Sequence, residues 1–310
     1  MATLGIDLGG TYARAAVVDA SGTIVAHEKR AHGGGSPEHV AGVIAAVGQA
    51  AMARVPLLPV YGVGVGLAGQ LQGDTGVIRV APNLGWREVP FGALLRERLG
   101  REVTVVNDLS AALWGEYRAG AGRGEEVLLM ISVGSGVGSA IVVGGRLLAG
   151  ATGVAGEFGH VKVQPGGRLC GCGERGCLEA YVGGHALADQ TRELMKGPRG
   201  AGLSRLHMDA RPVDGRLLEE AARAGDPVAS ELFQRAGMLL GLAVANQVTM
   251  LNPGRLIVGG GTLHHVPGLR VALELGVRAH ASMVSSQALT IVDAELGDDA
   301  GLIGAALLAT

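Results

Sequence analysis

The chain has 310 residues, a formal net charge of −2 and only three cysteines, all of them within residues 170–179. Its length suits about two domains of roughly 100–200 residues each, and the near-neutral charge excludes the basic surface of a nucleic-acid-binding protein. The first twenty residues lack a basic segment and a small-residue cleavage site, and no run of about 18 apolar residues predicts a membrane span. An odd number of clustered cysteines favours a reducing compartment, so we expect a cytoplasmic protein.

The first third of the chain alternates short apolar segments with turns. Three strands are predicted, at residues 3–8, 13–18 and 23–29, and the first two form a hairpin. Ser36 before Pro37 predicts the start of a helix that ends near residue 54. Two further strands and a helix follow, at 60–67, 103–106 and about 108–118.

The same order of elements starts again near residue 127. Short strands separated by glycine pairs are predicted at 127–133, 137–143 and 146–148. Helices fill 184–251 with breaks near 197–198 and 226–227, then come a strand over 255–258 and a last helix over 298–308, behind an aspartate pair that suits its dipole. The repeat predicts an α/β protein with a duplicated domain. Its 54 glycines, far above the usual share of about 7%, are expected mainly at strand ends.

Three glycine clusters follow predicted strands, and each could bring backbone N–H groups close to a phosphate. The first, Gly9-Gly10-Thr11, comes directly after Asp7, whose carboxylate could hold Mg²⁺ through water. The second covers residues 134–136 and the third 259–261. Two such turns, one per half of the chain, can hold a triphosphate from both sides. The alternative is that all three are only tight turns.

Two other phosphate-binding motifs are excluded by their context. No lysine follows a glycine and precedes serine or threonine, as a P-loop requires. Gly64, Gly66 and Gly69 have the spacing of a dinucleotide-binding fingerprint. They run into a hairpin-like segment where that fingerprint needs a helix, so this match carries no prediction.

Asn107 and Asp108 lie between a predicted strand and the helix that follows it. Asp108 is either the N-cap of that helix or a base at the C-terminal end of the strand, where α/β folds place their chemistry. The local sequence leaves both interpretations open.

The cysteines predict a metal site. His160, Cys170, Cys172 and Cys177 form a Cys₃His set with spacings of ten, two and five residues, which suits a closed, tetrahedral structural zinc site. A redox pair of Cys170 and Cys172 is the alternative. A nucleic-acid-binding zinc finger is excluded, because paired CxxC motifs are absent and the segment is not basic.

Several motifs in order resemble one family along essentially the whole chain, the ROK sugar kinases and particularly the bacterial ATP-dependent glucokinases. These motifs are DLGGT at 7–11, APN at 81–83, ND at 107–108, GSGVG at 134–138, EFGH at 157–160, CGCGERGCLE at 170–179, GGG at 259–261 and GDDAGLIGA at 297–305. The cysteine-containing segment after EFGH is the most specific of them.

This resemblance implies an α/β, actin-like ATPase (ribonuclease H-like) fold with sugar and Mg·ATP held in a cleft between two domains. The small domain would comprise 1–109 and 297–310, and the large domain 110–296 with the zinc segment. Asp108 would be the catalytic base. The other residues implied to contact sugar are Gly69, Asn83, Asn107, Glu157, His160 and Glu179. The residues implied to bind nucleotide are Asp7, Gly9, Gly10, Thr11, Gly134, Ser135, Gly136, Gly259, Gly260 and Gly261.

The activity implied is phosphorylation of glucose to glucose 6-phosphate, and related enzymes are commonly dimers or tetramers. The alternatives are fructose, mannose, N-acetylmannosamine or N-acetylglucosamine as substrate, or a sugar sensor without catalysis. Repressors of the family carry an N-terminal helix-turn-helix, whereas the first strand here is expected at Thr3, and both Asp7 and Asp108 are retained. The chain departs from the family at Ala68, Ser135 and the segment 182–184, which leaves the choice of sugar open.

Overall fold

A computed structural model describes residues 2–206 and 212–309. The chain forms two compact units. The first comprises residues 1–128, 140–156 and 294–310, and the second comprises 129–139 and 157–293. The division predicted from sequence, with boundaries at 109/110 and 296/297, stays a prediction.

Two five-stranded sheets repeat one strand order, as the restart of the sequence pattern predicts. The first sheet has the order β3-β2-β1-β4-β8, from β1 (Ala2–Leu8), β2 (Tyr12–Asp19), β3 (Ile24–Ala31), β4 (Val60–Leu67) and β8 (Val103–Asn107). The second has the order β11-β10-β9-β12-β13, from β9 (Val127–Val133), β10 (Val137–Val143), β11 (Arg146–Leu147), β12 (Arg255–Gly259) and β13 (Thr290–Asp293). In the first sheet β1 pairs antiparallel with β2 and parallel with β4, which also lies parallel to β8.

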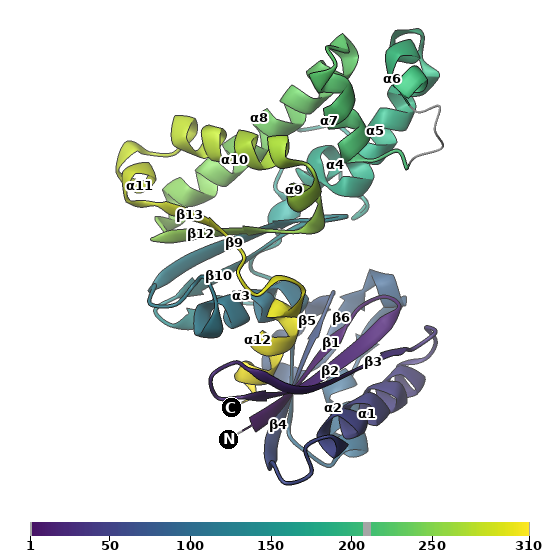
Figure 1. Cartoon of the computed structure of the whole chain (residues 1–310), viewed down its shortest axis with the longest axis vertical. Coiled ribbons are helices and arrows are strands. Elements are labelled where there is room, and N and C mark those ends of the chain that lie inside the picture. Colours follow the sequence, from purple (N-terminus) through teal and green to yellow (C-terminus); the bar gives the residue numbers. More distant parts are fainter. Residues whose placement is uncertain (1, 207–211, 310) are drawn as a thin grey trace. The chain divides into compact units, whose positions relative to one another are not determined.

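Successive side chains of the strands point to opposite faces of the first sheet, and both faces are buried. Leu4 and Ile6 of β1 belong to the core that also contains residues of α1 (Pro37–Ala53) and α2 (Phe91–Leu99). Figure 1 shows both helices on this side of the sheet. The predicted start of α1 is confirmed, since the Ser36 side chain accepts a hydrogen bond from the backbone of His39.

The other face of this sheet packs against α12 (Ala300–Leu308), which also contacts α3 (Asp108–Ala119) (Figure 1). The helix lies so close that a Cβ on Gly64 would be 1.7 Å from the carbonyl oxygen of Ala305, and one on Gly62 would be 2.3 Å from that of Ala309. These glycines therefore serve helix packing inside a strand. Helix packing thus accounts for Gly64 of the fingerprint spacing, and these two glycines lie within a strand and not at its end.

The segment after β4 forms a small three-stranded sheet, as far as the described residues show. It contains β5 (Gln70–Leu71), β6 (Ile78–Ala81) and β7 (Trp86–Val89), with short 3₁₀ turns at Gly73–Thr75 and Pro82–Leu84. The absence of a helix directly after residue 69 is confirmed. Strands β6 and β7 and helix α2 were not predicted, because their apolar runs are only a few residues long.

Helices make up most of the second unit. In chain order they are α4 (Glu179–Val182), α5 (Gly184–Lys196), α6 (Ala201–Leu206), α7 (Gly215–Arg223), α8 (Pro227–Leu251), α9 (Gly261–His265), α10 (Pro267–His280) and α11 (Met283–Ala288). Both predicted breaks are confirmed, and Asp226 caps α8 directly before Pro227. The final helix α12 starts two residues later than predicted, since 297–299 form a 3₁₀ turn. Part of the stretch predicted as helical, 207–211, lies outside the described residues.

Among the described residues, helix α8 is long and apolar enough to cross a membrane, by length and composition alone. The sequence pattern did not predict such a segment. The best window of α8 has a mean hydropathy of 1.2, but 56% of that window is buried inside the protein. A buried core helix passes the same test, so this is weak support for a span.

Candidate active site and metal site

The first glycine turn joins β1 to β2 and follows a paired carboxylate. The register places Asp7 opposite Arg14, whose Nε and Nη2 both donate to Asp7 Oδ2 at 3.0 and 2.7 Å. Arg14 Nη1 also donates to Asp299 Oδ1 at 3.1 Å, in the turn before α12. The turn itself is tight, with Gly9 N–H donating to the Tyr12 carbonyl at 3.0 Å, and its residues are exposed. Asp7 is thus held in place beside an exposed turn.

Asn107, and not Asp108, caps α3. Asn107 Oδ1 accepts hydrogen bonds from the backbone N–H groups of Leu109 and Ser110 at 3.0 and 3.2 Å. Its Nδ2 donates to the carbonyl of Gly69 at 3.3 Å. The N-cap interpretation of Asp108 is therefore wrong, because the preceding residue already has that role. Asp108 is the first residue of α3, at the C-terminal end of β8, where a base is expected in this kind of fold.

The environment of Asp108 favours proton acceptance. Burial raises the pKa of the Asp108 carboxyl above its usual range and the charge of Asp7 raises it further, although the N–H of Leu109 acts in the opposite direction. A carboxylate with a raised pKa is a better base. The predicted sugar residue Asn83 follows β6 and is exposed, and a Cβ on Gly10 would lie 3.9 Å from its Cβ. The first unit thus brings Asn83 beside the first glycine turn.

The four predicted zinc ligands come together in the second unit. One ligand atom from each of His160, Cys170, Cys172 and Cys177 lies within 4.8 Å of every other. The Cys172 and Cys177 sulfurs are 3.8 Å apart, and Cys170 Sγ is 3.7 Å from His160 Nδ1. A tetrahedral zinc with Zn–S bonds of about 2.3 Å needs sulfurs roughly 3.8 Å apart. The residues therefore fit a zinc ion, and the spacing is too long for a disulfide.

The charges around this cluster suit a zinc–thiolate centre with a net negative charge. Three thiolates and Zn²⁺ together carry one negative charge, and Lys162 Nζ lies 3.0 Å from Cys177 Sγ. That contact raises the pKa of the Lys162 ammonium. Burial raises the pKa of the Cys170 thiol to about 12, so its ligation requires displacement of a proton by the metal.

Two carboxylates flank the metal site. His160 presents Nδ1 to the cysteines, and its Nε2 lies 3.5 Å from Glu157 Oε2. Glu179 lies two residues after Cys177, and its Oε2 accepts a hydrogen bond from the Val137 N–H at 2.9 Å. Glu157, His160 and Glu179 are thus ordered by the same segment that holds the cysteines. Glu179 additionally links that segment to the second glycine turn.

The second glycine turn joins β9 to β10 and contacts the third glycine cluster. The carbonyl of Gly134 accepts hydrogen bonds from Thr262 Oγ1 at 2.7 Å and from the Gly184 N–H at 2.9 Å. Gly260 has a φ of +96° and packs on the backbone of Val133, where a Cβ would be 2.5 Å away. The predicted nucleotide residues 134–136 and 259–261 are therefore neighbours in the second unit.

Several residues that build these sites were not predicted from sequence. Arg14 could have been found from the hairpin register, because the four residues between Leu8 and Ala13 place position 7 opposite position 14. Thr262 and Lys162 have no local signal, because their partners are far away in the sequence or depend on the fold of the cysteine segment. His32, which contacts the first turn, lies in a glycine-rich segment without any motif.

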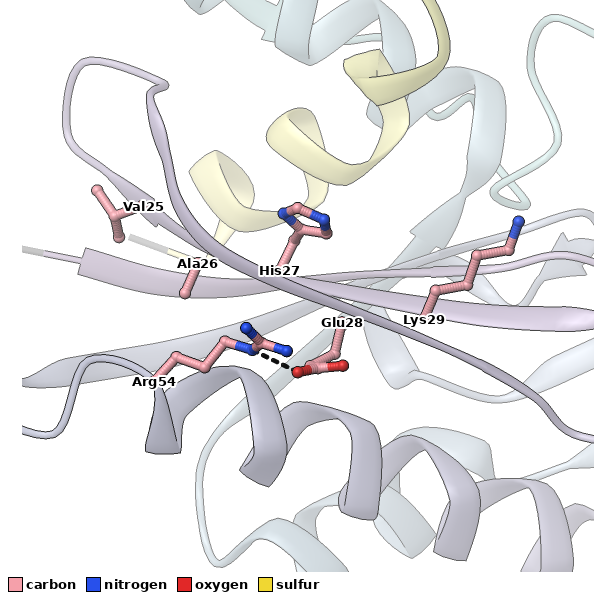
Figure 2. Close-up of a pocket in the computed structure, with 6 residues that line it drawn as sticks. All are labelled: Val25, Ala26, His27, Glu28, Lys29 and Arg54. Carbon is pink, nitrogen blue, oxygen red and sulfur yellow. Dashed lines mark hydrogen bonds and ion pairs between the residues drawn. The ribbon is translucent and has the colours of Figure 1, made fainter.

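A surface recess lies elsewhere, along the outer strand of the first sheet. Figure 2 shows the six residues that line it, Val25, Ala26, His27, Glu28, Lys29 and Arg54, with Glu28 and Arg54 forming an ion pair. It contains none of the predicted site residues.

The repeated strand order, with a glycine turn after the first strand of each sheet, is that of the actin-like ATPase fold. Residues 3–310 match the ROK family, so the chain belongs to this family. It is 34% identical over 313 residues to a glucokinase of Streptomyces coelicolor, covering 99% of this chain and 97% of that protein.

Solved structures agree with this family. A ROK hexokinase from Thermus thermophilus has a TM-score of 0.86 and 36% identity, covering 100% of this chain and 98% of the other. A Streptomyces griseus ROK glucokinase in complex with glucose and AMPPNP has a TM-score of 0.77 and 36% identity, covering 100% and 99%. The chain is also 31% identical over 317 residues to an N-acetylmannosamine kinase of Escherichia coli, covering 100% and 98%.

Proposed function

We propose that this ROK protein transfers the γ-phosphoryl group of ATP to glucose and forms glucose 6-phosphate. Its class is that of an ATP-dependent sugar kinase, in line with full-length similarity to glucokinases, one of them solved with glucose and AMPPNP. The observation that carries the proposal is the arrangement at the end of β8. Asn107 takes the capping role, which leaves the half-buried carboxylate of Asp108 at the strand end as a base.

In the proposed reaction Asp108 orients the attacking sugar hydroxyl and accepts its proton as the O–P bond forms. Phosphoryl transfer has a loose transition state, so positioning and charge neutralisation contribute most of the catalysis. Mg²⁺ bound with ATP would supply that neutralisation, and Asp7 would hold it through water. The turns at 9–11 and 134–136 would bind phosphates through backbone N–H groups. Residues 259–261 would lie near adenosine.

The remaining polar residues would recognise the sugar. Asn83, Asn107 with Gly69 beside it, Glu157, His160 and Glu179 would contact its hydroxyl groups. Ionised carboxylates are strong acceptors, and a site built for a hydroxyl discriminates against an analogue that lacks it. The exposed position of Asn83 and the ordered carboxylate of Glu179 support these roles.

We propose a structural role for zinc at the Cys₃His cluster. The four ligands leave no open position for a substrate. With Nδ1 of His160 on the metal, Nε2 points toward Glu157 and is available to a hydroxyl. The metal would thus fix the wall that carries three of the proposed sugar contacts, and would take no part in the chemistry.

N-acetylmannosamine is the second candidate substrate, supported by the 31% identity to the Escherichia coli kinase for that sugar. A sugar sensor without catalysis is a further alternative, since a xylose repressor of Caldicellulosiruptor bescii is 28% identical over 260 residues, covering 83% of this chain and 65% of that protein. Retention of both Asp7 and Asp108 favours the enzyme. The cytoplasmic location and a dimeric or tetrameric state stay predictions.

A coupled assay of ATP consumption over a panel of hexoses and N-acetylhexosamines tests the proposal. The expected result is the highest kcat/KM with glucose. A higher value with N-acetylmannosamine would replace the substrate, and no stimulation by any sugar would refute the kinase assignment.

A further inference from the structure

A buried histidine holds the first glycine turn. His32 follows β3, is 2% exposed and contacts the turn through two groups. Its backbone N–H donates to the Thr11 carbonyl at 3.1 Å, and its side-chain Nε2 lies 3.0 Å from the carbonyl oxygen of Gly9. Two of the carbonyl groups in the turn are therefore engaged by one residue.

The partners of His32 determine where its ring carries a proton. The carbonyl of Gly9 can only accept, so Nε2 is the donor. The backbone N–H of Gly34 donates to Nδ1 at 3.1 Å, so Nδ1 carries no hydrogen. His39, in the first turn of α1, fixes the segment further because its Nε2 donates to the His32 carbonyl at 3.0 Å. The ring is neutral and is held at both nitrogens.

The bond to Gly9 also determines where the next N–H group points. In a trans peptide the carbonyl and the N–H lie on opposite sides, so a Gly9 carbonyl directed at His32 directs the Gly10 N–H away from it. Gly10 is exposed. Neither glycine has a Cβ that would resist rotation of this peptide unit. Without His32 the peptide could flip and present its carbonyl oxygen to solvent.

We propose that His32 is a positioning residue that keeps the Gly10 N–H directed at a phosphate of ATP. This inference rests on the proposed function, in which the turn at 9–11 binds phosphates. A donor that is oriented before the ligand arrives needs no reorganisation when it binds. A flipped peptide would place a carbonyl oxygen against an anion, so it would weaken nucleotide binding and leave the sugar contacts unchanged.

The test compares His32→Ala, His32→Asn and His32→Gln by steady-state kinetics with ATP and sugar varied separately. We expect His32→Ala to raise the KM for ATP about tenfold, as for loss of one hydrogen bond in a buried network, with the KM for sugar unchanged. The Gln amide can replace Nε2 and should restore most of the loss, whereas the shorter Asn should not. The matched control is His27→Ala, at an exposed histidine of β3, the strand that precedes His32.

Equal losses for ATP and sugar, or a Gln variant no better than the Ala variant, would overturn the inference. If the Ala variant does not fold, calorimetric titration of AMPPNP into the Gln and Asn variants gives the same comparison, with weaker binding expected only for Asn. Failure of the proposed function is distinguishable, because wild-type protein would then neither bind AMPPNP nor consume ATP with any sugar.

Discussion

The two glycine turns occupy the same place in the repeated sheets and differ in what surrounds them. The turn at 9–11 follows Asp7, which is paired with Arg14, and His32 holds its carbonyls. The turn at 134–136 follows Val133, and Thr262 and the start of α5 hold its carbonyls. The duplicated fold sets where each turn lies, whereas residues from other segments decide its chemistry.

The carboxylates near the two turns come from different kinds of segment. In the first unit Asp7 and Asp108 come from strand ends, and the charge of Asp7 helps to raise the pKa of Asp108. In the second unit Glu179 comes from the metal-binding segment and accepts the Val137 N–H. We therefore propose acid–base chemistry and cation binding for the first turn region, and recognition of nucleotide and sugar without acid–base chemistry for the second. The predictions below test that assignment.

The largest effect is expected at Asp108. Replacement by Asn keeps the shape of the side chain but removes the base, so kcat should fall by about a thousandfold while the dissociation constant for sugar changes little. Steady-state kinetics and calorimetric titration measure the two quantities. Asp189→Asn, an exposed aspartate of α5, is the control. A near-normal kcat in Asp108→Asn would show that the acid–base chemistry does not lie in the first turn region.

The metal cluster should affect sugar binding more than turnover. Cys172→Ser is expected to lose the bound zinc and to raise the KM for sugar about tenfold, because His160 and Glu179 lose their fixed positions. Elemental analysis of wild-type protein and variant, with sugar kinetics, gives both results. Absence of zinc from the wild-type protein would refute the site, and an unchanged sugar KM in a zinc-free variant would separate the metal from recognition.

Thr262 tests the second turn alone. Thr262→Val keeps the shape of the side chain and removes the hydroxyl that donates to the Gly134 carbonyl, so the KM for ATP should rise about fivefold. The KM for sugar should stay the same. Thr249→Val, which removes a hydroxyl from α8 in the same unit, serves for comparison. A rise in the sugar KM alone would contradict the nucleotide assignment.

The smallest effect concerns pH. A base must be deprotonated, so kcat/KM should rise with pH through a pKa above the usual aspartate value, because the pKa of Asp108 is raised by burial and by Asp7. Asp7→Asn removes a negative charge and should move this acidic limb to lower pH, in whatever activity remains. The pH profile of kcat/KM for both proteins measures the shift. A limb that moves to higher pH would show that Asp108 is not the titrating group.

Much of this protein follows from short-range sequence. The short apolar runs at 3–8 and 13–18, with two glycines between them, predict a hairpin. The Cys₃His spacing predicts a metal site because all four candidate ligands lie within eighteen residues. The local sequence also singles out Asp108, at the junction of a strand and a helix. Only the hydrogen-bond geometry of the structure shows that Asn107, and not Asp108, is the cap of that helix.

Tertiary structure decided what no local pattern contains. Thr262 and Gly134 are 128 residues apart, and Gly64 needs to be glycine only because Ala305 lies against it. His32 has no motif, and its role comes from the closing of β3 and α1 onto a turn more than twenty residues earlier. Side-chain spacing along a chain specifies helices, strands and local ligand sets, whereas contacts between distant segments exist only after those elements have packed.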